Sequence, residues 1–324
     1  MILKRKLPVN FKEEDLYLFQ HELSVEAHEP TIHELNWLLL DTYWSVAYNH
    51  LNKIKKHGLL YSNMRLRKLL SPRLKYSHLL PVFTDQWSIN YSHWFTEVVP
   101  RIMYLMEHRQ DLTFIIPESL YKISFIHESL KFIPGLQTEV ITLKQPTKYL
   151  VKKALICDLN MIPGNYHPAV VQKVRDRFVQ QATADVKLNT GAMFIYRSLA
   201  QGRGILNFTE LEVVLKKYTV EIVDVALLGL TEKIQKISST KVLIGVHGAG
   251  LTNMLFMQEA SSVFELRKKG DSHNNCFFAL ASALNHSYYY QLCAVDDEQL
   301  DTQRNNFIVD IPAFENNLKQ LLHA

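Results

Sequence analysis

The stretch KVLIGVHGAGLTN, residues 241–253, joins a short apolar run to a turn that holds two closely spaced glycines. Residues 241–246 predict a buried strand, and the turn after them predicts the start of a helix. Gly248 and Gly250 allow a tight turn and a close approach of the backbone to a ligand, because glycine has no Cβ. A strand that passes through such a turn into a helix is typical of an open α/β sheet, whose ligands lie beyond the carboxyl ends of the strands.

The sequence on both sides repeats this alternation of strand and helix. In the second half of the chain, strands are predicted at residues 192–196, 219–223, 262–266 and 288–292, and helices at 209–217, 228–237, 273–284 and 313–322. In the first half, a helix is predicted from near Ser92, with strands at 112–116, 139–143 and 154–157 and helices at 123–132 and 169–182. Short strands separated by helices predict parallel, doubly wound sheets. Residues 184–191 are the expected linker, so we predict two Rossmann-like domains, residues 1–185 and 186–324.

Composition and charge restrict the function further. The 324 residues are 47% hydrophobic, which is enough for two cores, and the net charge of +4 is too small to indicate nucleic-acid binding. The three cysteines are widely spaced, which argues against a disulfide framework or a zinc site. No apolar run reaches the length of a membrane span, and the charged N-terminus does not resemble a secretory signal. We expect a cytoplasmic protein, with peripheral membrane contact through the basic residues of 53–68 left open.

The loop GVHGAGLTN, residues 245–253, is the first candidate for a binding site. The N-terminus of a helix presents unpaired N–H groups and a positive dipole end, which suit a diphosphate. The spacing of its glycines departs from the GxGxxG pattern of dinucleotide folds, so a nucleotide-sugar diphosphate fits better than a dinucleotide. In the alternative interpretation, the glycines serve only the turn and His247 is hydrogen-bonded in the core.

A second candidate is IYRSLAQGRGILN, residues 195–207, which follows another predicted strand. Arg197 and Arg203 lie near glycines, and guanidinium groups bind phosphate oxygens in a bidentate manner. The alternative is a pair of solvent-exposed loop arginines.

The third candidate is NYSHWFTEVVPR, residues 90–101, at the start of a predicted helix. His93 and Glu97 are four positions apart, so they share a helix face and can form a hydrogen bond. A carboxylate oriented by histidine is suited to removing a proton from a hydroxyl group. The alternative is an ordinary ion pair on the helix.

Together with SVFEL, residues 262–266, these three segments resemble glycosyltransferase family 61 in order and spacing over roughly residues 80–295. The resemblance is to bacterial members that build capsular or surface polysaccharide. It implies a GT-B fold with two facing Rossmann-like domains, the first on the acceptor side and the second binding the nucleotide sugar. It also implies an inverting reaction without a metal-binding DxD motif and without a cofactor.

The resemblance assigns roles to particular residues. The loop of His247, Gly248, Ala249 and Gly250 would bind the donor, Arg197 and Arg203 its diphosphate, and Glu265 its ribose or base, while Asn253 would brace the loop. Glu97 would be the general base, oriented or replaced by His93. Asp85, near the start of the same helix, is an alternative base.

The expected partners are a nucleotide-sugar donor, taken to be a UDP-sugar, and a glycan or lipid-linked glycan acceptor. The expected function is a transferase of polysaccharide biosynthesis. Two alternatives remain at this stage: a nucleotide-sugar epimerase on the same fold, and a noncatalytic sugar-nucleotide-binding or scaffold protein.

Overall fold

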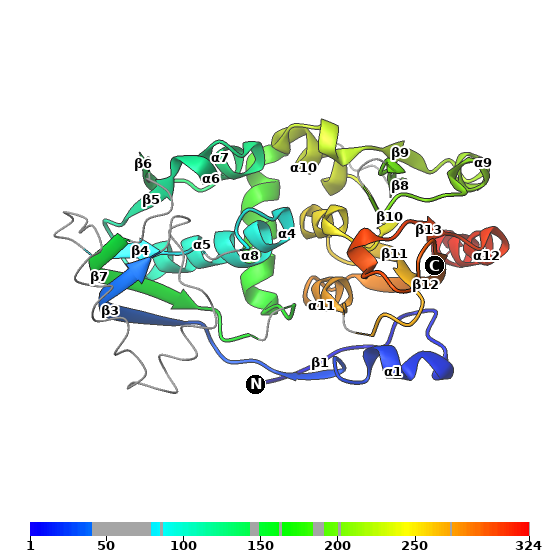
Figure 1. The fold of residues 1–324 in the computed structure, drawn as a ribbon, viewed down its shortest axis with the longest axis horizontal. Coiled ribbons are helices and arrows are strands. Elements are labelled where there is room, and N and C mark those ends of the chain that lie inside the picture. Colours follow the sequence, from blue (N-terminus) through cyan, green and yellow to red (C-terminus); the bar gives the residue numbers. More distant parts are fainter. Residues whose placement is uncertain are drawn as a thin grey trace. The chain divides into compact units, whose positions relative to one another are not determined.

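The computed structural model describes residues 1–40, 79–84, 87–142, 149–161, 164–183, 191–199, 202–272 and 274–323 (Figure 1). The chain divides into two compact units, unit 1 (Met1–Ala27 with Met161–Ala324) and unit 2 (His28–Asn160). This division differs from the predicted ranges 1–185 and 186–324, because the N-terminal segment and helix α8 (Pro168–Ala182) belong to unit 1. The predicted basic region within 53–68 and nearly all of the predicted linker lie outside the described residues. The functional roles expected for the two domains stay predictions.

Unit 1 is built on a six-stranded sheet with strand order β13-β12-β11-β10-β8-β9. Its strands are β8 (Ala192–Ile195), β9 (Glu221–Val223), β10 (Val242–Val246), β11 (Ser262–Lys268), β12 (Ser287–Val295) and β13 (Phe307–Ile308). All neighbouring pairs are parallel except β12 with β13. The connecting and flanking helices are α9 (Phe208–Lys217), η4 (Val225–Leu227), α10 (Leu230–Ser238), η5 (Ala249–Phe256), α11 (Cys276–Ala283), η6 (Thr302–Arg304) and α12 (Ile311–His323). The parallel α/β sheet predicted for this part of the chain is confirmed.

The strand order creates a topological switch point between β8 and β10. From β8 the chain moves outward to β9, and it then returns to the other side of β8 to form β10 (Figure 1). The loops that leave β8 and β10 therefore diverge to opposite sides of the sheet, and ligands of open α/β sheets bind at such a point. The loop with Arg197 and Arg203 (the arginine loop) follows β8, and the loop of residues 247–250 (the glycine loop) follows β10, so both candidate binding segments lie at the switch point.

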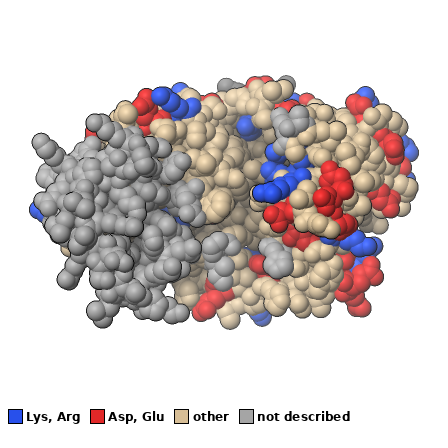
Figure 2. All heavy atoms as spheres, viewed as in Figure 1, with Lys and Arg blue, Asp and Glu red and all other residues tan. Residues whose placement is uncertain are grey.

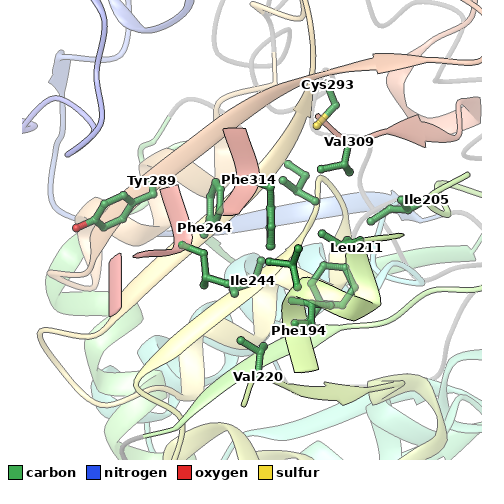
Figure 3. Close-up of a cluster of buried hydrophobic side chains, with 14 of the residues drawn as sticks. Phe194, Ile205, Leu211, Val220, Ile244, Phe264, Tyr289, Cys293, Val309 and Phe314 are labelled. Carbon is green, nitrogen blue, oxygen red and sulfur yellow. The ribbon is translucent and has the colours of Figure 1, made fainter. Parts of the chain in front are cut away.

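One face of this sheet packs on a cluster of buried apolar side chains (Figure 3). Phe194, Ile244 and Phe264 come from three adjacent strands and pack against Leu211 of α9 and Phe314 of α12. The rings of Phe264 and Phe314 stack with centroids 5.4 Å apart. Since side chains alternate along a strand, the intervening residues of β11 point to the opposite face. The strands of a parallel sheet are covered on both faces, and this packing fixes the position of their carboxyl ends.

The N-terminal segment packs on the sheet of unit 1. It contains β1 (Ile2–Lys4), η1 (Glu13–Asp15), α1 (Leu16–Phe19) and β2 (Ser24–Glu26). The Val9 amide donates to the Tyr288 carbonyl at 2.9 Å, and the Tyr290 hydroxyl donates to Asp15 at 2.5 Å. Phe19 meets the rings of Phe278 and Tyr290 edge to face, each at 5.1 Å. A segment in which the sequence shows no motif is thus part of the core of unit 1.

Unit 2 has a different sheet arrangement. Strand β7 (Tyr149–Asp158) pairs with β3 (Thr31–Leu40) antiparallel and with β4 (Leu80–Val82) parallel. A separate parallel pair consists of β5 (Thr113–Pro117) and β6 (Gln137–Ile141). The helices are α4 (Tyr91–His93), η2 (Trp94–Val98), α5 (Val99–His108), α6 (Glu118–Tyr121) and α7 (Ser124–Leu130). The mixed α/β class is confirmed, while the finer prediction of a GT-B fold with a second Rossmann-like domain stays a prediction.

Two further properties concern the described residues only. None of their helices is both long and apolar enough to cross a membrane. On the face drawn in Figure 2, acidic and basic side chains lie interspersed among uncharged ones, which agrees with the small net charge of +4.

Candidate functional site

The glycine loop after β10 is held by backbone and side-chain hydrogen bonds. The His247 amide donates to the Leu266 carbonyl at 2.9 Å, which extends the pairing of β10 with β11 by one residue. The Asn253 side chain is 1% exposed and donates to the Gly250 carbonyl at 2.7 Å. Asn253 thus braces the turn, as predicted, and the first turn of η5 is fixed against the end of β10.

Both glycines of this loop allow close contacts. A Cβ on Gly248 would lie 2.8 Å from Nη1 of Arg203, and a Cβ on Gly250 would lie 3.1 Å from Cγ2 of Ile195. Ile195 is the last residue of β8, so Gly250 lets η5 pack against that strand. The glycines therefore do more than form a turn, because they also bring the arginine loop and the glycine loop together.

Arg203 and Arg197 lie close enough for their positive charges to repel each other. Burial lowers the pKa of Arg203 to about 10, and the positive charge of Arg197 adds to this effect. Burial also lowers the pKa of Arg197, while the carboxylate of Asp224 opposes the shift. Both side chains are half-buried, so the alternative of two exposed loop arginines is wrong. Two neighbouring, partly buried guanidinium groups favour an anionic ligand.

Arg203 is the more specialised of the two arginines. Its φ of 59° is the left-handed conformation that glycine and asparagine adopt most easily. Its Nη1 lies 3.5 Å from the His247 carbonyl oxygen, and its buried Nε has no hydrogen-bond partner among the described residues. An arginine held in a strained conformation with an unsatisfied buried N–H group is typical of a binding site.

Behind the loop, His247 is bonded to a fully buried carboxylate. Its Nδ1 lies 2.5 Å from Oε1 of Glu265, and the hydroxyl of Tyr288 donates to Oε2 of Glu265 at 2.5 Å. Glu265 is 0% exposed. The buried carboxylate is thus bonded to His247, a residue of the glycine loop. The role predicted for Glu265 at the ribose or base of the donor stays a prediction.

Arg267 supports the same buried group from two residues along β11. It is 1% exposed, donates to the Asn275 side chain at 2.8 Å and lies over the ring of Phe19 at 5.3 Å. Burial alone would lower the pKa of Arg267, but Tyr288 and the Glu265 carboxylate outweigh burial and raise it. The sequence analysis did not single out Tyr288 or Arg267. The sequence held one signal for this buried network, which is the placement of two charged residues, Glu265 and Arg267, on the same face of an apolar strand.

The His93–Glu97 pair lies in unit 2. The helix starts after Asn90, whose side chain accepts from the Ser92 amide at 2.9 Å, and a π-helical turn at η2 precedes α5. Nδ1 of His93 lies 2.8 Å from Oε1 of Glu97, and Nη2 of Arg101 lies 3.7 Å from Oε2 of Glu97. The predicted hydrogen bond is confirmed, and its catalytic role stays a prediction.

A proline follows the π-helical turn, and the His93–Glu97 pair before it is partly accessible. Pro100 stands in the first turn of α5, where its missing N–H costs little. The side chains of His93 and Glu97 are 34% and 18% exposed. The His93–Glu97 pair lies in unit 2, whereas the arginine and glycine loops lie in unit 1. Asp85, the alternative base, lies outside the described residues.

A metal centre is not evident in the described part of the chain, where no three or more His, Cys, Asp or Glu side chains gather as ligands. A switch point with two arginines, a glycine turn and a helix N-terminus defines an α/β unit suited to a phosphate-bearing ligand. The family model of glycosyltransferase 61 matches residues 91–264, more than half of the chain. The chain belongs to the glycosyltransferase 61 family.

Relatives with curated names match a shorter part of the chain. The EGF domain-specific O-linked N-acetylglucosamine transferase of Bos taurus is 40% identical over 84 residues, which are 24% of this chain and 16% of that protein. The same-named protein of Drosophila melanogaster is 39% identical over 82 residues, 24% of this chain and 15% of the relative. The same-named protein of Xenopus laevis is 31% identical over 120 residues, which are 36% of this chain and 19% of that protein.

This chain therefore covers less than a fifth of the length of these curated relatives. They are animal proteins named for an acceptor that is a protein domain. They do not support the narrower resemblance to bacterial capsular enzymes.

Proposed function

We propose that this chain is an inverting glycosyltransferase that moves a sugar from a nucleotide-sugar donor to an acceptor hydroxyl group. The observation that carries the proposal is the arginine pair at the switch point. Burial and the charge of Arg197 lower the pKa of Arg203, so an anion beside the two guanidinium groups would be stabilised, and Gly248 lets the Arg203 side chain approach the glycine loop closely. A donor diphosphate has the charge for this position.

In the proposed reaction, the acceptor hydroxyl attacks the anomeric carbon while the bond to the diphosphate breaks. Glu97 takes the proton of that hydroxyl, and His93, bonded to Glu97 at 2.8 Å, orients the carboxylate. The diphosphate leaves with added negative charge, which Arg197, Arg203 and the N-terminus of η5 stabilise. Two permanent positive charges can do this without a divalent cation, so we propose a metal-independent reaction without a cofactor.

The finer fold and domain assignments belong to this proposal. We propose a GT-B enzyme in which unit 1 binds the donor and unit 2 contributes the general base. The parallel sheet and switch point of unit 1 support the first assignment, and the partly exposed His93–Glu97 pair of unit 2 supports the second.

Donor and acceptor are proposed at the level of chemical class. A UDP-sugar is our choice of donor, and the name of the curated relatives makes N-acetylglucosamine the first sugar to test. The acceptor would be a glycan or a lipid-linked glycan of surface polysaccharide synthesis in the cytoplasm, with the enzyme free or at the membrane surface. A protein domain, as in the names of the relatives, is the competing acceptor.

The donor site is tested by thermal shift of the purified chain with UDP, GDP, CMP and dTDP, each with and without a chelator. Saturation at about a hundred times Kd should add about 2.7 kcal/mol to the free energy of unfolding. We expect one nucleotide to raise Tm with the chelator present. Arg203→Gln should lose the shift, and Arg304→Gln, which removes an exposed arginine of unit 1, should keep it.

Two results would count against the proposal. One is the absence of a shift with all four nucleotides, and the other is a normal shift in Arg203→Gln. Conversion of the donor sugar in the absence of any acceptor would instead indicate an epimerase.

A further inference from the structure

Trp87 is an exposed aromatic residue in unit 2. Its side chain is 54% exposed, whereas Trp94, seven residues further along, is completely buried and bonded to Ser129. Tryptophan is a large apolar residue that proteins bury to a high degree on average. An indole ring left this open is a common feature of recognition surfaces.

The backbone of Trp87 is held in a tight turn. The Asn90 amide donates to the Trp87 carbonyl at 2.8 Å and closes a tight turn, and Ser88 within that turn is fully buried. The turn leads directly into the helix whose first residues are capped by Asn90. A side chain on a short, anchored turn loses little conformational entropy when a ligand binds.

The indole lies beside the candidate general base. It stacks on the imidazole of His93 with ring centroids 5.8 Å apart and an angle of 25° between the planes. His93 in turn is bonded to Glu97. A ligand on the exposed part of the indole would therefore lie near the His93–Glu97 pair.

We propose that Trp87 is the acceptor platform of the enzyme and binds the C–H face of a pyranose ring. The face of an indole carries negative charge density and attracts the weakly positive C–H groups of a sugar, while the sugar hydroxyls stay solvated at the rim. One hydroxyl of the stacked ring is then presented to Glu97. This inference rests on the proposed function, and it selects a sugar, rather than a bare peptide side chain, as the group that receives the transfer.

The test is saturation-transfer NMR with five methyl pyranosides, those of glucose, galactose, xylose, mannose and N-acetylglucosamine. We expect at least one to bind the intact chain. Trp87→Ala should weaken its binding about tenfold, in line with about 1.4 kcal/mol for an aromatic contact. Trp87→Phe should stay within about threefold, because a smaller aromatic face remains.

Ile89→Ala is the matched control, because Ile89 is 52% exposed in the same turn. It should bind the pyranoside like the unmodified chain. Retention of binding in Trp87→Phe excludes a mere folding defect, and near-ultraviolet circular dichroism checks the packing of each variant.

The proposal is overturned if none of the five pyranosides binds, or if Trp87→Ala binds as tightly as the unmodified chain. It is also overturned if a folded EGF domain receives sugar at equal rates from both forms. In these cases an intact nucleotide-induced thermal shift would leave the transferase assignment standing. Loss of that shift in the unmodified chain would instead contradict the proposed function itself.

Discussion

At the scale of single residues, the proposed donor site carries conformational and electrostatic strain. Arg203 adopts a φ of 59°, its guanidinium is partly buried, and Arg197 is a second positive charge beside it. Each of these features costs stability in the empty protein. An anionic ligand would remove the electrostatic part of that cost. The two positive charges that destabilise the protein are therefore the same charges that favour binding of the ligand.

We therefore expect Arg203→Asn to stabilise the protein while impairing its function. Asparagine tolerates the left-handed conformation, and the buried charge is lost, so the free energy of unfolding should rise by about 1 kcal/mol. Nucleotide affinity should fall about 10- to 100-fold, because charge-assisted hydrogen bonds disappear. Urea denaturation and calorimetric titration measure the two effects. A less stable variant with unchanged affinity would contradict this account.

His286 leads to a second prediction, which concerns the stability of the folded protein at low pH. Burial lowers its pKa from 6.5 to about 4, and the charges of Arg175 and Lys241 add to this while a hydrogen bond to the Met254 carbonyl opposes it. Above pH 6.5 the imidazole is neutral in both the folded and the unfolded chain. As the pH falls from 6.5 to about 4, only the unfolded chain gains the proton, so stability is lost over that window, by up to about 3 kcal/mol.

His286→Gln should be less sensitive to acid, since glutamine does not titrate. The slope of unfolding free energy between pH 6.5 and 4 should become clearly shallower than in the unmodified chain. His21→Gln changes an exposed histidine and is the control. Equal slopes in both variants would show that another group governs acid unfolding.

At the scale of elements, the neighbouring strands β11 and β12 place apolar side chains on one face of the sheet and a polar network on the other. Phe264 and Tyr289 belong to the apolar cluster on one face. On the other face Glu265 joins His247 to Tyr288, and Arg267 lies near them. The pleat separates core packing from the polar network, so one strand pair supports both the fold and the glycine loop.

Tyr288→Phe should show that the network supports the site. Loss of the hydroxyl leaves one buried oxygen of Glu265 without its donor, which should cost about 2 kcal/mol of stability. The orientation of His247 should loosen, visible as shifted imidazole nitrogen resonances and a weaker nucleotide-induced thermal shift. Tyr289→Phe changes the neighbouring tyrosine, on the apolar face, and should leave those resonances unchanged. Identical behaviour of the two variants would refute a role for the network.

At the scale of the whole molecule, the chain forms unit 1 from two distant segments. Residues 1–27 pack with residues 161–324, and Phe19 contacts rings of α11 and β12. Phe19 also lies under Arg267 and thereby touches the network behind the glycine loop. The N-terminal segment is therefore connected to the candidate donor site through the core of unit 1.

Phe19→Ala should affect unit 1 selectively. Removing a fully buried phenylalanine typically costs about 3–5 kcal/mol. Hydrogen exchange should accelerate in α11 and β12, while β5 and β6 of unit 2 keep their protection. Tyr17→Ala removes a 45% exposed ring from the same helix and should have little effect. Equal loss of protection in both units would mean that they unfold as one.

The local sequence pattern was sufficient to predict many of the helices, strands and turns of this protein. The alternation of apolar strands with periodic helices predicted the elements of unit 1 closely, for example α8 and β10. The spacing of His93 and Glu97 predicted their hydrogen bond, because residues four apart meet on any helix. The glycine turn after β10 was also evident, since its signal lies within a few consecutive residues.

Tertiary structure alone decided the remaining features. Strand order places the arginine loop beside a glycine loop more than forty residues further along the chain, and it adds the N-terminal segment to β12 across some 280 residues. It also buried Glu265, which the sequence placed at the ligand. Such contacts depend on which apolar faces pack together, and many pairings satisfy the same local pattern. The sequence by itself therefore determined the elements and their motifs, whereas the packing of distant strands determined which motifs meet.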